Sequence, residues 1–385
     1  MPSVSRVPKN PKVVSPDAPS GPDYLSVLQR VAVEAGLHEM GVAPADVMHR
    51  ALEQLHDRES RDLTNGMKFT YLRPERSTNP ALLVDGARSL IVGMRSYAYD
   101  DPISVDNGVV RARVARYAWE DHYGELKASL TAVAAHLRGD GHRATVFADD
   151  NSIVDRETAW LAGLGWYGRN ANILVPGKGS MFVIGCIVTT ADLPRGIEVA
   201  DGCGTCSRCI PACPTGAIVE DGVIDAKRCL SWLLQKPGVF DRRYREALGD
   251  RIYGCDECQV VCPPTKKFGT HESPSRLQTH VDVLQLLSMP DTALDAECDR
   301  WYVHDRDMTW VRRNLLIVLG NSGVPTDPGT VETISRYLSH ERPELRAHAV
   351  WAAARMGLTH LLHFDDPDSV VVAELENLPP LRGDL

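Results

Sequence analysis

Cysteine spacing is the feature of this 385-residue sequence that most directly indicates chemistry. Residues 203–214 read CGTCSRCIPACP, a C-x2-C-x2-C-x3-C-P run. Runs of this kind bind [4Fe–4S] clusters, because tight two-residue turns present three thiolates to one cubane from a single loop. The fourth cysteine of such a run ligates the other cluster of a pair, so the run also predicts a second cluster.

The second cluster has its own candidate ligands. Residues 255–263 read CDECQVVCP, with the same Cys-Pro ending but one upstream cysteine fewer, and Cys229 supplies the missing thiolate. Exchanging the fourth ligands predicts two sets of four: Cys203, Cys206, Cys209 and Cys262 for one cluster, and Cys213, Cys229, Cys255 and Cys258 for the other. A zinc ribbon is the alternative, but it uses two separated cysteine pairs and does not account for a triplet followed by Cys-Pro.

The rest of the composition is that of an ordinary globular protein, with 43% hydrophobic and 24% charged residues. Cys186 and Cys298 have no partner at ligand spacing, so we expect both to be packing residues. The N-terminus lacks the apolar core of a signal peptide, and no apolar run is long enough to span a membrane. We therefore expect a cytoplasmic protein with reduced thiols and no membrane partner. The net charge of −9 argues against extensive coating of nucleic acid.

Helix and strand patterns divide the chain into four parts. Residues 1–22, rich in proline, predict a flexible leader. An α/β domain is predicted over 23–196, where branched apolar strands alternate with helices: strands at 87–97, 145–148 and 181–190, and helices at 24–31, 125–137 and 156–162. The cysteine block predicts a ferredoxin-like double-cluster domain over 197–270, and residues 271–385 predict a helical domain with an acidic tail.

The helical region contains a weak internal repeat. RNLLIVLG at 313–320 resembles RAHAVWAA at 346–353. Paired helices that recur at such a period are typical of an α-solenoid, so we expect a HEAT-like domain. An ordinary helical hairpin that caps the core is the alternative, since two copies are fewer than a solenoid usually needs.

Two further motifs invite a functional interpretation. GLGWYG at 163–168 satisfies G-x-G-x-x-G, but helix precedes it and strand follows, the reverse of a dinucleotide-binding turn. We expect a helix C-cap and a close backbone turn there, with room for a flat ligand to approach the glycines. Asp149 and Asp150 end a predicted strand, where catalytic carboxylates tend to lie. A solvated pair that starts a turn is the alternative, and nothing in their local sequence ranks one above the other.

Taken together, these motifs resemble the epoxyqueuosine reductase family. The resemblance rests on ADDNSIVDRETAWLAGLGWYGRN at 148–170, the cysteine block, and RRNLLIVLGNSG at 312–323, and it runs from about Asp23 to Gly357. It implies a cobalamin-dependent oxidoreductase that reduces epoxyqueuosine to queuosine at the wobble position of tRNA, with a core similar to that of reductive dehalogenases.

The resemblance also implies roles for individual residues. Asp149 takes the position of the family's proton donor. The implied cobalamin contacts are Arg73, Asp149, Gly163, Gly165, Trp166, Gly168, Arg169, Asn170 and Ser231. The sequence departs from the family at 150–152, where Ser-x-Pro is expected, and at Arg169, where Lys is usual; both departures bear on the substrate. No Asp-x-His-x-x-Gly occurs, so no histidine is expected as a lower cobalt ligand by that route.

The implied partners are a tRNA anticodon stem-loop and an external one-electron donor of flavodoxin or ferredoxin type, and we expect a monomer. Four arginines of the helical region are expected to hold the tRNA: Arg312, Arg313, Arg342 and Arg346. Two alternatives remain open. One is a cobalamin and iron–sulfur reductase of a small molecule, similar to a dehalogenase. The other is an iron–sulfur electron carrier whose helical repeat docks a protein, and such a carrier would need no proton donor.

Overall fold

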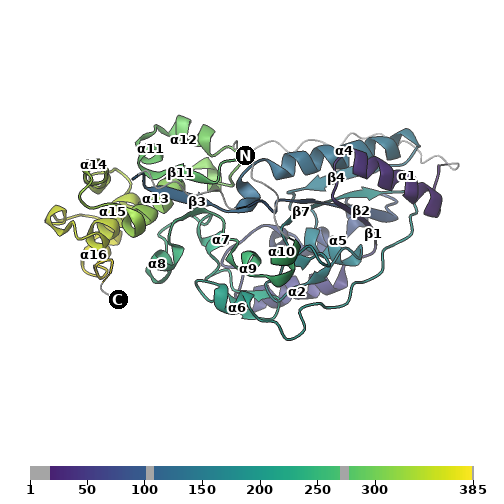
Figure 1. Cartoon of the computed structure of the whole chain (residues 1–385), viewed down its shortest axis with the longest axis horizontal. Coiled ribbons are helices and arrows are strands. Elements are labelled where there is room, and N and C mark those ends of the chain that lie inside the picture. Colours follow the sequence, from purple (N-terminus) through teal and green to yellow (C-terminus); the bar gives the residue numbers. More distant parts are fainter. Residues whose placement is uncertain (1–17, 101–107, 269–276, 384–385) are drawn as a thin grey trace.

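The structure is a computed structural model that describes residues 18–100, 108–268 and 277–383. Most of the expected leader, residues 1–17, lies outside the described residues. A helix-covered sheet forms one end of the molecule and a group of packed helices forms the other (Figure 1). The cysteine-rich segment lies against the sheet end, on the side of α2 and α5 (Figure 1).

The main sheet has four strands in the order β1-β2-β7-β4, and neighbouring strands pair antiparallel. The strands are β1 (Glu39–Pro44), β2 (Ser89–Ser96), β7 (Phe182–Thr189) and β4 (Ala144–Ala148). Helices α1 (Gly21–Glu34) and α4 (His122–Gly139) cover one face, and α2 (His49–Ser60) and α5 (Asp155–Leu161) cover the other. The mixed α/β architecture predicted for this region is therefore confirmed, with each predicted strand and helix found within a few residues of its expected bounds.

Alternation along the strands explains the two covered faces. Ile91 of β2 packs with Leu130 of α4 in one core, whereas its neighbours Leu90 and Val92 pack with Ala159 of α5 in the other. Successive side chains of a strand point to opposite faces of a sheet, so a strand that is apolar at every position is buried on both.

A second sheet joins segments that are far apart in the sequence. Its central strand β3 (Arg111–Val114) pairs parallel with β10 (Arg251–Tyr253) and antiparallel with β11 (His280–Asp282). The strands come from the parts of the chain predicted as the α/β, the double-cluster and the helical domain. This sheet therefore interlocks the three parts, and the exact domain boundaries stay a prediction.

The C-terminal part is helical, as expected. It comprises α11 (Val283–Ser288), α12 (Asp291–Glu297), α13 (Thr309–Ser322), α14 (Pro328–Leu338), α15 (Pro343–Arg355) and α16 (Ser369–Leu375). The two segments of the internal repeat lie in α13 and α15, which pack on each other. Gly320 permits this approach, because a Cβ there would lie 2.6 Å from the Trp351 ring.

The cysteine-rich segment contains only short elements. They are α6 (Cys209–Ala212), β8 (Ile218–Glu220), β9 (Val223–Ile224), α7 (Leu230–Leu233), α8 (Arg245–Leu248), α9 (Glu257–Val260) and α10 (Pro263–Phe268). Other short elements are η1 (Thr70–Leu72), α3 (Pro74–Ser77), η2 (Pro80–Leu82), η3 (Arg116–Ala118), β5 (Trp166–Tyr167), β6 (Ile173–Leu174), η4 (Arg242–Tyr244), η5 (His304–Arg306) and η6 (Thr359–Leu361). Across the described ranges, no helix is both long and apolar enough to cross a membrane.

Candidate functional site

The eight cysteines of the predicted clusters are unpaired thiols that gather in two groups. Burial raises the pKa of Cys262, a backbone hydrogen bond at Thr265 opposes the rise, and the thiols of Cys203, Cys209 and Cys206 add to it. These four are the first predicted ligand set. No three or more His, Cys, Asp or Glu side chains in the described residues converge in the manner of a site for a single metal ion.

The second group forms around Cys258, whose pKa is raised by burial. The thiols that add to this rise are, in order, those of Cys255, Cys229, Cys213 and Cys209. Cys209 belongs to the first predicted set, so the two groups adjoin. The crossed assignment of ligands stays a prediction, and this grouping is the arrangement that it requires.

The turn at 163–168 has the predicted form. Gly163 follows the C-cap of α5 with φ +70°, its N–H donates to Trp160 O, and the N–H of Leu164 donates to Ala159 O. This is the Schellman pattern that ends many helices. A Cβ on Gly163 would lie 2.3 Å from Ile197 O, and a Cβ on Gly165 would lie 2.3 Å from Leu174 O. The missing side chains of these glycines therefore allow other backbone segments of the protein to approach closely. Their contact with a flat ligand stays a prediction.

Side chains after this turn reach the cysteine loops. Trp166 Nε1 donates a hydrogen bond to Cys203 Sγ at 3.4 Å. Arg169 donates to Gly204 O and pairs with Asp221, while Asn170 Nδ2 donates to Cys258 O. Three residues expected to contact cobalamin thus connect the α/β fold to the loops of both cysteine groups.

The structure distinguishes the two aspartates that end β4. Asp150 Oδ1 accepts a hydrogen bond from the N–H of Ser152 at 2.7 Å, the turn-forming role considered for the pair. Asp149 has φ +52°, and its carboxyl is accessible to solvent although protein atoms crowd one side. This partial burial raises the pKa of Asp149, and the charges of Asp150 and Asp121 raise it further against the opposing effect of Lys127. The proton-donor role of Asp149 stays a prediction, and the direction of its pKa shift agrees with it.

Tyrosines that the sequence did not single out connect Asp149 with the second cysteine group. Tyr253 of β10 is close enough to Asp149 to interact with its charge, and burial raises the pKa of Tyr253 to about 12. Its ring centroid lies 6.0 Å from that of Tyr117, and the two phenols interact. Tyr117 also interacts with the side chain of Ser231, whose backbone N–H faces the thiol of Cys229.

Arg156 is a second residue that the motifs did not identify as functional. It is exposed at the start of α5, and its charge reaches Tyr97, Tyr123 and Cys229. A cation in this position can attract an anionic substrate to the region between Asp149 and the cysteines. Arg73, expected to contact cobalamin, is exposed immediately before α3.

Two of the arginines expected to hold tRNA are instead structural, so that prediction is wrong for Arg312 and Arg313. Arg312 is 7% exposed and donates to backbone carbonyls of Leu287 and Met289. Arg313 is 1% exposed, and its guanidinium holds the turn after α7 through the carbonyls of residues 233, 234, 236 and 238. Their helix face packs inward. The sequence could not reveal this, because the residue type alone does not say whether an arginine is buried or exposed to solvent.

Comparisons with known proteins agree with this arrangement. A model of the 4Fe-4S double cluster binding domain matches residues 202–265. Epoxyqueuosine reductase of Xanthomonas campestris is 31% identical over 363 residues, which cover 88% of this chain and 98% of the relative. The chain belongs to the epoxyqueuosine reductase family. The family enzyme of Vibrio cholerae is 30% identical over 86% of the chain and 92% of its own, and that of Bacillus anthracis is 28% identical over 84% and 86%.

Solved structures of the family share this fold. An epoxyqueuosine reductase bound to an epoxyqueuosine-modified tRNA-Tyr stem loop superposes with a TM-score of 0.82 at 25% identity, covering 92% of this chain and 97% of that one. The Streptococcus thermophilus enzyme superposes with a TM-score of 0.84 at 24% identity, covering 92% and 98%. Membership makes this chain an oxidoreductase with a double [4Fe–4S] segment.

Proposed function

We propose that this chain reduces epoxyqueuosine to queuosine at the wobble position of tRNA, with Asp149 as proton donor and two [4Fe–4S] clusters and cobalamin as cofactors. The observation that carries the proposal is the linked path from Asp149 through Tyr253, Tyr117 and Ser231 to Cys229. In this proposal the carboxyl at one end of the path holds a proton and the thiol at the other end binds a cluster, as a reduction coupled to proton transfer requires.

The residues present fit cobalamin. A large flat macrocycle needs an apolar surface with few polar contacts. The rings of Tyr117, Tyr123 and Tyr253 supply that surface, and Ser231, Arg73 and the backbone of 163–170 would supply the polar contacts. When bound, cobalamin supplies the redox chemistry that acts on the epoxide. Its location beside these tyrosines is part of the proposal.

The protein's own residues handle protons and electrons. Crowding by protein and the charge of Asp150 favour the neutral form of Asp149, so its proton is available to the oxygen that leaves as water. An external one-electron donor of flavodoxin or ferredoxin type would reduce one cluster, and the adjoining cysteine groups give a short route to the other. The crossed ligand sets and the cytoplasm as the place of action belong to the same proposal.

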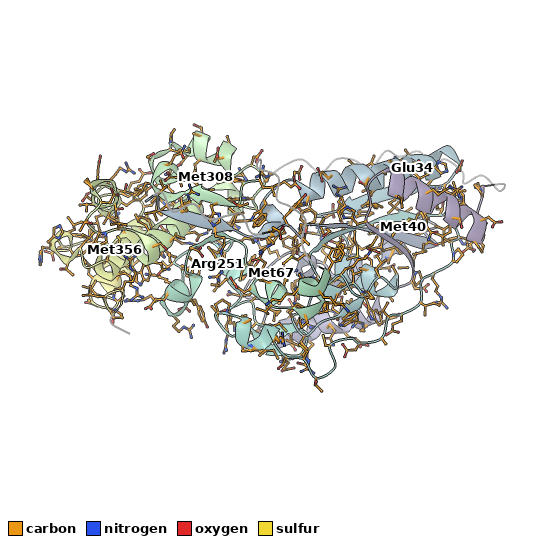
Figure 2. The ribbon with its side chains drawn as sticks, viewed as in Figure 1. Glu34, Met40, Met67, Arg251, Met308 and Met356 are labelled. Carbon is orange, nitrogen blue, oxygen red and sulfur yellow. The ribbon has the colours of Figure 1, made fainter. Side chains whose placement is uncertain are left out.

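The helical part would hold the anticodon stem-loop, and we expect a monomeric enzyme with a HEAT-like C-terminal domain. Phe69, which precedes η1, meets Tyr302 of the helical end edge to face, with ring centroids 6.5 Å apart. The rings are 39% and 47% exposed, and the N–H of Tyr302 donates to the hydroxyl of Tyr253. Figure 2 shows Met67, two residues before Phe69, near the middle of the molecule's long axis. Exposed aromatic rings stack on unpaired bases, so this pair is the proposed contact for an anticodon-loop base.

The test uses reconstituted protein, a chemical one-electron reductant and a tRNA anticodon stem-loop that carries epoxyqueuosine. The expected result is queuosine in the RNA, with turnover dependent on cobalamin. Equal or faster turnover of a small epoxide or halide, without turnover of the RNA, would favour the dehalogenase-like alternative. A protein that binds both clusters and accepts electrons but takes up no cobalamin would favour the electron carrier.

A further inference from the structure

Asp155, the first residue of α5, has one carboxyl oxygen that forms no hydrogen bond with the described residues. Oδ1 of Asp155 is enclosed by protein and has no hydrogen-bond partner among the described residues, although the residue as a whole is only half-buried. An unpaired carboxylate oxygen in such a place is costly, whereas a neutral carboxyl is tolerated far better. The site therefore favours a carboxyl that keeps its proton.

The groups that face Asp155 act in the same direction. Burial raises the pKa of Asp155 well above its usual range, the charges of Asp149 and Asp150 add to the rise, and Arg156 opposes it. From the other elements, Cys186 of β7 and Tyr123 of α4 interact with Asp155. Both have pKa values raised by burial, so both are neutral and neither offsets the acidic neighbours.

The proposed reaction needs more protons than one carboxyl can hold. Converting an epoxide into an alkene breaks two C–O bonds, forms one C=C bond and releases the oxygen as water. The balance requires two electrons, which the iron–sulfur clusters deliver one at a time, and two protons. Asp149 accounts for one of these protons, so a second source must deliver a proton either to the same oxygen or to Asp149.

We propose that Asp155 stores the second proton and passes it to Asp149 after Asp149 has given up its own. This inference rests on the proposed function. In this scheme each of the two carboxyls starts with one proton. Asp149 protonates the oxygen as the first C–O bond opens, Asp155 reprotonates Asp149, and Asp149 then protonates the resulting hydroxyl, which leaves as water. The pair ends as two adjacent carboxylates, whose repulsion favours proton uptake from solvent through the exposed loop at 149–152. Asp155 is a positioning residue, because it acts through Asp149.

Neighbouring groups are less suited to this role. Asp150 is exposed, and its Oδ1 is occupied by the N–H of Ser152. The phenol of Tyr123 and the thiol of Cys186 hold their protons too strongly at neutral pH to donate them. Asp155 is the carboxyl of this set that is both enclosed and unpaired.

The first test uses infrared spectroscopy of the protein without cobalamin or substrate. Wild type should show carbonyl absorption from two protonated carboxyls at neutral pH, and Asp155→Asn should lose the part that belongs to Asp155 while that of Asp149 remains. Asp150→Asn is the matched control and should keep both parts. Absence of protonated carboxyl absorption from wild type at neutral pH, or an unchanged intensity of that absorption in Asp155→Asn, would overturn the proposal.

The second test measures turnover of epoxyqueuosine in the stem-loop against pH. Asp155→Asn should lower kcat on the order of tenfold at mildly alkaline pH, with a smaller loss at mildly acidic pH where solvent supplies protons faster. Its solvent deuterium isotope effect should rise, KM should stay near the wild-type value, and Asp155→Glu should restore most of the activity. Cluster and cobalamin spectra verify that each variant is folded.

The two tests separate this inference from the proposed function. Suppose that the wild-type protein reduces the modified RNA and that Asp155→Asn has an unchanged pH profile. This pair of results contradicts only the role of Asp155 as the second proton source. If the wild-type protein does not reduce the modified RNA, the proposed function is contradicted. The inference about Asp155 then fails as well, whatever the infrared result.

Discussion

The indole nitrogen of Trp166 donates a hydrogen bond to the sulfur of Cys203 across 3.4 Å. The same ring fills the space above Gly202, where a Cβ would lie 2.7 Å from it. Trp166 thus both donates to a proposed cluster ligand and packs against the loop that carries it. Hydrogen bonds to cluster sulfurs and exclusion of water are two of the means by which a protein sets a cluster's reduction potential.

Replacing Trp166 by Phe should lower the potential of the first cluster. The donor that stabilises the reduced, more negative cluster is lost, and a hydrogen bond worth about 1 kcal/mol corresponds to roughly 40 mV for one electron. A redox titration followed by electron paramagnetic resonance measures the shift. Trp160→Phe is the control, since Trp160 stacks on Arg50 rather than on a cysteine. Equal potentials in the two variants would contradict the assignment.

Asp149→Asn should fold, keep both clusters and cobalamin, and lose turnover by roughly 10²–10⁴-fold, the usual effect of removing a general acid. The amide preserves shape and removes the proton. Asp150→Asn should be far milder, because Asp150 serves the turn through Ser152. Turnover is measured with the modified stem-loop. Similar losses in both variants would show that the turn, rather than the proton, matters.

The crossed ligand sets predict which cluster each cysteine variant damages. Cys213→Ser should impair the second cluster although Cys213 belongs to the first run in the sequence, and Cys262→Ser should impair the first. Cys186→Ser is the control, because the buried thiol of Cys186 lies in β7 among apolar side chains. Iron and sulfide analysis with electron paramagnetic resonance distinguishes the clusters. If each variant damages only the cluster bound by the other cysteines of its own sequence run, the exchange of fourth ligands is refuted.

The buried side chain of His348 should make the free energy of unfolding decrease as pH falls. Its ring is fully buried, and Nε2 accepts the N–H of Phe240. Burial, then the charge of Arg245, lowers the pKa of His348 well below 6.5. Below 6.5 the unfolded chain binds a proton that the folded protein does not, so the free energy of unfolding decreases as pH falls, by up to about 1.4 kcal/mol per unit.

Anaerobic denaturant unfolding at several pH values tests this. His348→Gln should be less stable at neutral pH but show a flatter dependence on pH below 6.5 than wild type. His56→Gln is the control, since His56 is exposed and its loss should leave the slope unchanged. A wild-type slope retained in His348→Gln would assign the effect to other groups.

The aromatic pair should contribute to RNA binding. Phe69→Ala with Tyr302→Ala should weaken binding of the stem-loop, since stacking of one base on an aromatic ring contributes about 1–3 kcal/mol. Fluorescence anisotropy measures the Kd, and cluster reduction by the chemical donor should be unchanged. Val33→Ala removes an even more exposed apolar side chain from α1, at the sheet end of the molecule, and should have no effect. Unchanged affinity in the double variant would move the RNA site elsewhere.

Much of this protein is determined by local sequence. A cubane's ligands must come from tight turns, so the spacing of 203–214 and 255–263 predicts clusters without any knowledge of the fold. The Schellman end of α5 at Gly163 and the strands at β2, β4 and β7 follow from glycine and from branched apolar runs, which act over a few residues. For the same reason the family could be identified from motifs alone.

Tertiary structure decided the properties that depend on burial and on distant neighbours. Asp149 and Asp150 are adjacent and chemically identical, and only their surroundings make one a turn residue and raise the pKa of the other. Arg313 looked like an RNA contact until its helix face proved to be buried. Asp155 drew no attention, because the acids and the enclosure around it come from β4, α4 and β7 together. A pKa reflects desolvation and the sum of nearby charges, and both are set by the fold rather than by the residue.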